Sequence, residues 1–313
     1  MITLGVDTSN YTTSCALYDS ETGRISQRKK LLPVKPGEKG IRQSDAVFHH
    51  TAQLHLLLRD LFESEGAKPD AVGASSRPRD VEGSYMPCFT VGEGAADGIA
   101  SALGVPFFTF SHQAGHVMAA LYSCGKTELV KESFIAFHFS GGTTEALYVT
   151  PDKDKIFNCE IIGKTLDINC GQVIDRAGVM LGLDFPCGRE LESLAKKSGK
   201  TFNPKVCVKD GSCCLSGAEN LCSDMLSGGS PKEDVARFAI DYVGKTIEKM
   251  ALSASELYPG VPMIFAGGVS SDTIIRERIE SKFGASFAQP EFSCDNAAGT
   301  ALLAYERGKT DGG

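Results

Sequence analysis

A strand–turn–strand pattern occurs twice in this chain of 313 residues, and the two copies lie about 130 residues apart. In residues 1–20, the apolar strands ITLGVD and SCALYD flank the polar turn TSNYTT. Residues 133–150, SFIAFHFSGGTTEALYVT, repeat the pattern and carry two glycines in the turn. A duplication of this size predicts two related α/β halves, with nucleotide or phosphate chemistry in the cleft between them.

The segments outside the two hairpins alternate between helical and strand-like patterns. Apolar residues at helical spacing predict helices over about 45–65, 92–103, 111–123, 167–182, 188–198, 231–257, 272–282 and 295–307. Strands are expected near 70–75 and 105–109, over MIFA before a Gly-Gly turn, and near 285–288. This alternation predicts an α/β fold with a mixed or parallel sheet. We expect an N-terminal lobe over 1–130 and a C-terminal lobe over 131–313, whose final helix can pack back onto the first lobe.

The composition narrows the class of protein. A net charge of −7 and a pI near 5.5 argue against a protein that holds nucleic acid by bulk electrostatics alone. There is no apolar run of about 18 residues, and the N-terminus turns polar early, so we expect a cytoplasmic protein without membrane contact. Eleven cysteines then predict reduced thiols. The closest group, Cys207, Cys213, Cys214 and Cys222, lacks the C-x-x-C spacing of a metal site.

One local basic cluster stands out against the acidic background. Between residues 24 and 42, seven basic residues face a single acid, Glu38: Arg24, Arg28, Lys29, Lys30, Lys35, Lys39 and Arg42. Prolines and glycines interrupt this stretch, which predicts an irregular loop. Such a loop can meet a phosphate backbone or an acidic partner surface, and a simple solvated loop is the alternative.

His112 and His116 lie four residues apart in SHQAGH, and Ser111 stands where it can cap the helix. Both imidazoles would therefore project from one helix face, one turn apart. Two imidazoles in this arrangement can bind a first-row transition metal if a third ligand comes from elsewhere. A structural or exposed histidine pair is the alternative.

Two glycine turns follow apolar strands. Gly141 and Gly142 can aim backbone N–H groups at phosphate oxygens, and Gly267 and Gly268 would let an adenine or ribose approach the backbone. In the first hairpin, Asp7 and the nearby hydroxyl groups, including that of Ser9, can hold a hydrated cation or a phosphate. Plain hairpin turns are the alternative for each of these segments.

Carboxylates form a further candidate group. Asp167 and Asp175 are eight residues apart on one predicted helix, so both can face the same cleft. Gly188 and Glu192 begin the next helix and can line one pocket with Asp175. Paired carboxylates suit ribose hydroxyls or a metal, and an ordinary solvated helix face is the alternative.

Seven motifs follow one another along the chain: DTSNYTTS, SHQAGH, FSGGTTEA, KTLDINCGQVIDRAGVMLGLDFPCG, LSGAEN, FAGGVSSD and SCDNAAG. In order and spacing they resemble, over nearly the whole chain, the TsaD/YgjD (Gcp) family of tRNA threonylcarbamoyladenosine biosynthesis proteins. The resemblance implies the two-lobed fold with duplicated ribonuclease-H-like halves shared by actin, sugar kinases and the Hsp70 ATPase (the ASKHA fold). It also implies transfer of a threonylcarbamoyl group from threonylcarbamoyl-AMP to N6 of adenosine 37 in tRNA.

The resemblance also assigns roles to individual residues. It implies that His112, His116 and Asp295 bind one iron or zinc ion, and that Asp7 and Ser9 belong to the catalytic hairpin. An adenine nucleotide, with or without magnesium, would meet ten residues: Ser140, Gly141, Gly142, Thr143, Asp175, Gly188, Glu192, Gly267, Gly268 and Asp272. The implied partners are tRNA and other proteins of the same pathway, and the basic residues of 24–42 described above are the candidate contact for tRNA.

The chain departs from the family pattern at several motifs. Asn10, Tyr11 and Thr12 follow Ser9 where the family has two acids, Glu219 replaces a lysine, and Asp272 stands where asparagine is usual. One alternative is therefore a non-catalytic nucleotide- and metal-binding paralogue, acting as a partner or on another carbamoyl acceptor. A remote alternative is a metallopeptidase, although no glutamate adjoins the histidine pair as a general base.

Overall fold

The computed structural model describes residues 1–9, 11–33, 41–289 and 297–311. The chain forms two compact units. Unit 1 comprises Met1–Val130, Pro151–Asn158 and Cys294–Gly313, and unit 2 comprises Lys131–Thr150 and Cys159–Ser293. The C-terminal helix therefore belongs to the unit that contains the N-terminus.

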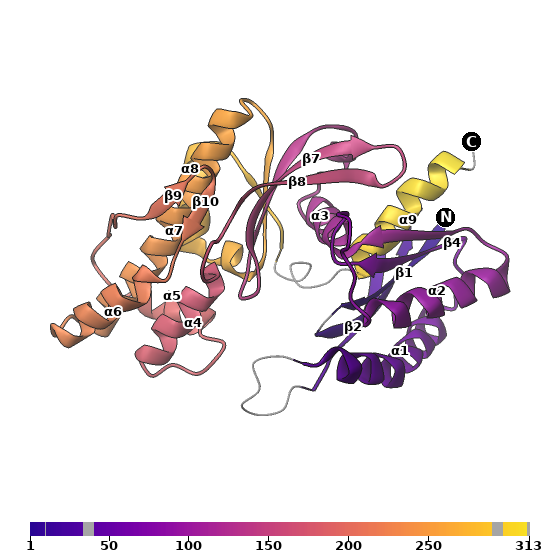
Figure 1. Cartoon of the computed structure of the whole chain (residues 1–313), viewed down its shortest axis with the longest axis horizontal. Coiled ribbons are helices and arrows are strands. Elements are labelled where there is room, and N and C mark those ends of the chain that lie inside the picture. The colour runs from indigo at the N-terminus through magenta and orange to yellow at the C-terminus, as the bar shows by residue number, and fades with distance from the viewer. Residues whose placement is uncertain (10, 34–40, 290–296, 312–313) are drawn as a thin grey trace. The chain divides into compact units, whose positions relative to one another are not determined.

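Unit 1 is built on a five-stranded sheet with the order β3-β2-β1-β4-β5 (Figure 1). Strand β2 pairs antiparallel with both β1 and β3, whereas β4 and β5 continue the sheet in parallel with β1. Its elements are β1 Ile2–Ser9, β2 Thr12–Asp19, β3 Arg24–Leu31, α1 Gln43–Glu65, β4 Ala71–Arg77, α2 Phe89–Leu103, β5 Phe107–Ser111, α3 His112–Ser123, the 3-10 helix η1 Thr127–Lys131 at its end, and α9 Ala297–Asp311.

Unit 2 repeats this plan, with a five-stranded sheet in the order β12-β11-β6-β7-β8. The hairpin of β6 and β7 is antiparallel, and β11 and β12 continue the sheet in parallel with β6. Its elements are β6 Phe134–Phe139, β7 Thr144–Asp152, β8 Ile156–Lys164, α4 Cys170–Met180, α5 Gly188–Ala195, β9 Cys207–Lys209, β10 Ser212–Cys214, α6 Gly217–Ser227, α7 Lys232–Leu257, β11 Met263–Ala266, η2 Gly268–Ser271, α8 Thr273–Phe283 and β12 Ser286–Phe287.

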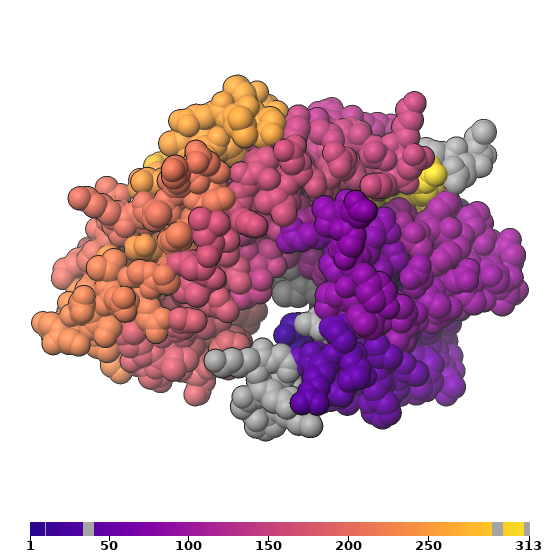
Figure 2. Space-filling view, in the orientation of Figure 1, coloured from indigo at the N-terminus to yellow at the C-terminus, as the bar shows by residue number. Residues whose placement is uncertain are grey.

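Each sheet has its own core. In unit 1, Leu4 and Val6 of β1 are fully buried with Val72 and Ala74 of β4. In unit 2, the 26-residue helix α7 supplies more residues to the core than any other helix. The shorter helix α6 reaches the surface of this unit on the face shown in Figure 2, and its Leu221 is 42% exposed. The repeated sheet plan confirms the predicted α/β fold with two related halves.

The helix α9 packs very closely on unit 1. A Cβ atom on Gly5 of β1 would lie 2.1 Å from the carbonyl oxygen of Ala297, and one on Gly299 would lie 1.9 Å from that of Gly115 in α3. Glycine is required at both positions because only a missing side chain permits this approach. Helix α9 thus lies against β1 on one side and α3 on the other.

The structure corrects the predicted basic loop. Residues Arg24–Leu31 form strand β3, paired along its whole length with β2, and residues 34–40 lie outside the described residues. Arg24 pairs with Glu65 and Arg28 with Asp60, both on α1. A charged, half-exposed strand is typical of a sheet edge, where lysines and arginines discourage further pairing.

A second correction concerns Asp167, which lies outside helix α4. Asn169 caps that helix, and a reciprocal hydrogen bond with Gln172 completes a capping box. Asp167 instead accepts hydrogen bonds from the backbone N–H groups of Leu215 (2.8 Å) and Ser216 (2.9 Å).

Among the described residues, no helix is both long and apolar enough to cross a membrane.

Candidate functional site

The predicted metal-binding histidines lie at the start of α3, directly after strand β5. Ser111 caps the helix, because its hydroxyl accepts a hydrogen bond from the N–H of Ala114 at 3.2 Å. The ring centroids of His112 and His116 are 4.6 Å apart. The predicted helix cap and the shared face of the two imidazoles are therefore both present.

Asp7 of β1 holds His112 in place. One carboxylate oxygen lies 2.8 Å from Nδ1 of His112, and the other accepts the backbone N–H of Ser9 at 2.9 Å. Burial alone would raise the pKa of Asp7, but the charge and hydrogen bond of His112 and hydrogen bonds from Ser75 and Ser9 outweigh it. The pKa falls to about 2, so Asp7 is ionised at neutral pH.

The donor set in unit 1 fits a transition metal in part. Because Nδ1 of His112 faces Asp7, Nε2 is the nitrogen with which this ring would bind an ion, as in carboxylate–histidine–metal triads. Asp295, the predicted third ligand, lies outside the described residues. Within residues 1–9, 11–33, 41–289 and 297–311, no three side chains of His, Cys, Asp or Glu are grouped as a metal would require.

The predicted phosphate turn lies between β6 and β7 in unit 2. The hydroxyl of Ser140 accepts hydrogen bonds from the N–H groups of Gly142 (3.3 Å) and Thr143 (3.0 Å), so this side chain shapes the turn. A Cβ atom on Gly141 or Gly142 would meet nothing within 4 Å. The fold itself thus leaves room for side chains at both positions, and the glycines leave open space over the turn.

Helix α4 begins against this turn. The N–H of Gly171 donates to the carbonyl oxygen of Ser140 at 3.1 Å, and a Cβ atom on Gly171 would lie 2.6 Å from the nitrogen of Gly141. The positive end of the helix dipole is therefore directed at the Ser140–Gly142 turn, an arrangement that favours anions. Gly171 is a residue that the sequence analysis did not single out.

Of the two glycines that follow β11, Gly267 is required by the fold and Gly268 is not. Gly267 has a φ angle of 92°, and its Cβ atom would lie 2.2 Å from the carbonyl oxygen of Phe139, so the fold alone requires glycine here. Gly268, at the start of η2, would accept a Cβ atom without any contact. The pair therefore combines a structural glycine with one that the packing does not explain.

Two carboxylates connect helices of unit 2. Asp175 of α4 accepts the N–H of Cys187 at 2.9 Å, directly before Gly188 begins α5. Glu192 of α5 accepts both the N–H (3.1 Å) and the hydroxyl (2.6 Å) of Thr273 at the start of α8. Gly188 would accept a Cβ atom without contact. The structure thus places Asp175 beside Gly188, and it places Glu192 in contact with Thr273, the neighbour of Asp272.

Asp272 caps α8 from a buried position. Its carboxylate accepts the N–H groups of Ile274 (2.9 Å) and Ile275 (3.1 Å), and the residue is only 7% exposed. Burial raises the pKa of Asp272 to about 6, and the negative charge of Glu192 adds to this rise. The Glu192 carboxyl is shifted the other way, because hydrogen bonds from Lys196 and Thr273 outweigh its burial and lower its pKa.

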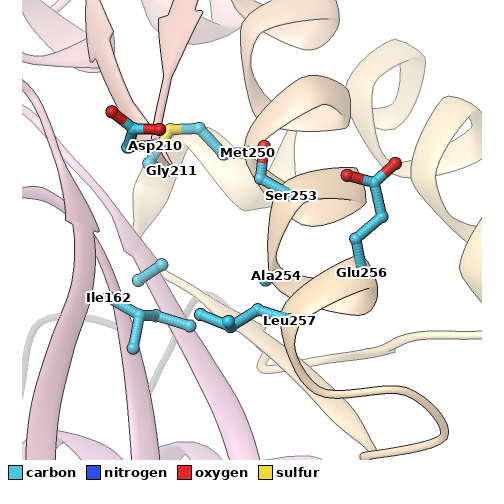
Figure 3. A pocket seen from close by; sticks show the side chains of 9 residues that line it. Ile162, Asp210, Gly211, Met250, Ser253, Ala254, Glu256 and Leu257 are labelled. Carbon is cyan, nitrogen blue, oxygen red and sulfur yellow. The ribbon is translucent and has the colours of Figure 1, made fainter.

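The described residues of unit 2 line at least two pockets. One, of about 510 Å³, is lined by Gln172, Asp175, Arg176, Val179, Met180, Phe185 and Glu219, so it includes one predicted nucleotide contact. Another, of about 450 Å³, lies between β8, helix α7 and the turn of the β9–β10 hairpin (Figure 3). It contains none of the predicted site residues.

The predicted residues therefore fall into two groups. All ten predicted nucleotide contacts lie in unit 2, whereas Asp7, Ser9, His112 and His116 lie in unit 1. Gly171 and Thr273 touch these groups and were missed. Gly171 had a detectable signal, since it follows the Asn169 cap, but Thr273 contacts Glu192 across 81 residues of sequence.

The paired sheets, each with a three-stranded antiparallel part extended by parallel strands, define an α/β protein of the ASKHA fold. Solved structures agree. HypF in its phosphate- and nucleotide-bound form gives a TM-score of 0.60 at 13% identity, covering 97% of this chain and 55% of that chain. A ROK family glucokinase from Streptomyces griseus in complex with glucose and AMPPNP gives a TM-score of 0.55 at 13% identity, covering 98% of this chain and 100% of that chain.

The sequence specifies the family within this fold. Residues 25–302 match the family model of TsaD, the tRNA N6-adenosine threonylcarbamoyltransferase, and the chain belongs to this family of transferases. Two relatives bearing that name come from Aromatoleum aromaticum (25% identity, 95% of this chain, 89% of the relative) and Thermosipho melanesiensis (28% identity, 98% and 94%).

Proposed function

We propose that this protein transfers a threonylcarbamoyl group from threonylcarbamoyl-AMP to N6 of adenosine 37 in tRNA, with a bound iron or zinc ion. The observation that carries the proposal is the contact of the buried Asp7 carboxylate with Nδ1 of His112 at 2.8 Å. A buried carboxylate that orients one imidazole of a pair is typical of catalytic metal centres. The relatives named above act on tRNA adenosine according to their names, which agrees with this chemistry.

His112, His116 and Asp295 would hold the metal. When bound, the ion would act as a Lewis acid toward the oxygens of the donor. Asp7 fixes the ring orientation of His112 and stays ionised, since its pKa is about 2. The backbone N–H of Ser9 in turn fixes the carboxylate of Asp7 at 2.9 Å, so we assign both residues of the first hairpin a positioning role.

The nucleotide part of the donor would bind in unit 2. The glycine turn at Gly141 and Gly142 leaves open space, and the α4 dipole favours phosphate there. Gly188 and Gly268 are open in the same way, which suits close approach of a ribose or a base. Asp175, Glu192 and Asp272 would supply acceptors for ribose hydroxyl or adenine amino groups. The positive end of the α4 dipole would stabilise the leaving AMP.

The tRNA would meet unit 1 through the basic residues of 24–42. Lys29 and Lys30 at the end of β3 are exposed, so we assign them to phosphate contacts. Other proteins of the same pathway are the proposed protein partners.

The deciding experiment measures threonylcarbamoyladenosine on a tRNA that reads ANN codons. Purified protein receives threonylcarbamoyl-AMP, with and without the pathway's other proteins, beside an ordinary family enzyme as positive control. We expect product from the wild type, and a loss of at least about 100-fold in the His112→Ala variant. His55→Ala is the matched control, since His55 is an exposed histidine on α1. Equal activity of His112→Ala and wild type would refute the assignment.

A second candidate function is that of a non-catalytic partner which binds nucleotide and metal. The observation that favours it is at Glu219, where the family has lysine: here Glu219 forms an ion pair with Arg176 at 2.7 Å. A carboxylate would repel tRNA phosphate at this position. Co-purification with an active family enzyme, together with no product from this chain in any combination, would establish this role.

A further inference from the structure

The hairpin of β9 and β10 in unit 2 has six strand residues, and three of them are cysteines: Cys207, Cys213 and Cys214. Its two-residue turn consists of Asp210 and Gly211, with φ angles of 49° and 74°. Two consecutive positive φ angles define a type I′ turn, which fixes the register of a two-residue hairpin. The strands accordingly pair Lys209 with Ser212, Val208 with Cys213, and Cys207 with Cys214.

This register places the thiols of Cys207 and Cys214 on the same face of the hairpin. Directly opposed residues of an antiparallel pair have Cα atoms about 4.5–5.5 Å apart. Disulfides form at Cα separations of about 4.4–6.8 Å. Cys213 is opposite Val208, and its side chain projects from the other face because neighbouring strand residues alternate.

Accessibility separates the same two cysteines from their neighbours. Cys207 is exposed and Cys214 is partly exposed, whereas Cys213 and Cys222 have 0% exposure. Burial raises the pKa of Cys213 to about 12 and that of Cys222 to about 11, so both remain protonated and out of reach. Only Cys207 and Cys214 in this cluster can meet a dissolved reagent.

Both ends of the hairpin are fixed. At the turn, the packing on β8 leaves no space for a side chain: a Cβ atom on Gly211 would lie 2.4 Å from the oxygen of Ile162. This turn also borders the pocket formed with α7 (Figure 3). At the other end, Leu215 and Ser216 donate their N–H groups to Asp167 directly after Cys214. The two thiols are therefore held in place by the fold, which raises their effective concentration toward each other.

We propose that Cys207 and Cys214 form a redox site, which closes to an intrachain disulfide when the chain meets a small-molecule disulfide. The exposed Cys207 thiolate attacks one sulfur of the reagent and releases one equivalent of small thiol. Cys214, as a thiolate after losing its proton, attacks the Cys207 sulfur of the mixed disulfide and releases the second equivalent. Two protein thiols and one reagent disulfide thus yield one protein disulfide and two small thiols. This site is independent of the proposed transferase function.

The test uses native full-length protein in buffers of oxidised and reduced glutathione, quenched with an alkylating reagent. Trypsin cleaves after Lys205, Lys209 and Lys232, so a Cys207–Cys214 disulfide joins peptide 206–209 to peptide 210–232. We expect this linked pair, about 2 Da lighter than the two reduced peptides, and its disappearance in reducing buffer. Because peptide 210–232 holds three cysteines, variants identify the partner.

Cys207→Ser and Cys214→Ser should each lower the yield of linked peptide by at least about tenfold, whereas Cys124→Ser, a partly exposed cysteine of unit 1, should retain it. Since both strand ends are at the surface, we expect the serine variants to keep the wild-type circular dichroism. Phenylarsine oxide, which bridges two close thiols, should protect Cys207 and Cys214 together from alkylation. A stable glutathione adduct on Cys207 with Cys214 still alkylatable, or a linked pair that persists in Cys214→Ser, would overturn the proposal.

Discussion

Replacement of Asp272 by asparagine should stabilise the protein at neutral pH. Asp272 is buried and caps α8, and its pKa of about 6 means that folding at pH 7.5 must keep a carboxylate charged in an unfavourable environment. The shift from the ordinary 3.8 is about 2 pKa units, which corresponds to about 3 kcal/mol at 1.36 kcal/mol per unit. Asparagine accepts the same capping hydrogen bonds without the charge. We therefore expect Asp272→Asn to gain about 1–3 kcal/mol.

The pH dependence gives this prediction its sign. The folded-state pKa is raised, so the native protein binds the proton more tightly than the unfolded chain between pH 3.8 and 6. The destabilisation by the charge is absent below pH 3.8, grows up to pH 6 and is constant above it. Hence the advantage of Asp272→Asn should be largest at pH 7.5 and close to zero at pH 4.

Urea unfolding of wild type and variant at pH 4 and pH 7.5 measures the difference at each pH. Asp167→Asn is the control of opposite sign. Burial would raise the pKa of Asp167, but hydrogen bonds from Ser216, Leu215 and Ile168 outweigh it and lower the pKa to about 2, so asparagine should destabilise here. An Asp272→Asn variant with the same stability difference at both pH values would refute the argument from burial.

Three further predictions concern glycines and histidines. Gly142→Val should weaken ATP binding, measured by calorimetry, by at least about tenfold without lowering the melting temperature, because its side chain meets open space. Gly267→Ala should instead lower the melting temperature. Unchanged ATP affinity in Gly142→Val would show that the turn contacts no nucleotide. His112→Ala should lose bound metal, measured by plasma emission spectroscopy, while His55→Ala keeps it. Full metal content in His112→Ala would contradict the assignment of His112 as a metal ligand. Gly299→Ala should cost about 1–3 kcal/mol in urea unfolding, because its Cβ would lie 1.9 Å from the Gly115 oxygen; a neutral effect would mean that α9 can move away from α3.

The fold was largely predictable because its elements have strong patterns. The two hairpins consist of apolar strands on either side of short polar turns, and the confirmed helices α1, α2, α3 and α7 keep apolar residues on one face. The edge strand β3 was missed because its residues are charged and half exposed, so no alternation marks a buried face. The β9–β10 hairpin and α6 were missed as well, although Asp210-Gly211 is a standard hairpin turn signal.

The candidate site was less accessible to prediction than the fold. Local features such as the Ser111 cap and the turn at Gly142 follow from a few adjacent residues, and the structure has both. The extension of α4 back to Asp167 was wrong because the capping box of Asn169 and Gln172 was overlooked. The contact of Asp7 with His112 spans 105 residues and depends on the sheet order β1-β4-β5, which brings the start of α3 near β1 and which no local pattern encodes.

The position of α9 determines the order in which the chain can be completed during synthesis. The sheet of unit 1 is made from the first 111 residues, but the helix that covers β1 and contacts α3 consists of residues 297–311. Translation proceeds from the N-terminus, so these strands emerge long before the helix that buries them. The neighbourhood of His112 and His116 therefore reaches its final packing only after unit 2 has been synthesised, so a metal centre in unit 1 would mature only once residues 297–311 have followed it.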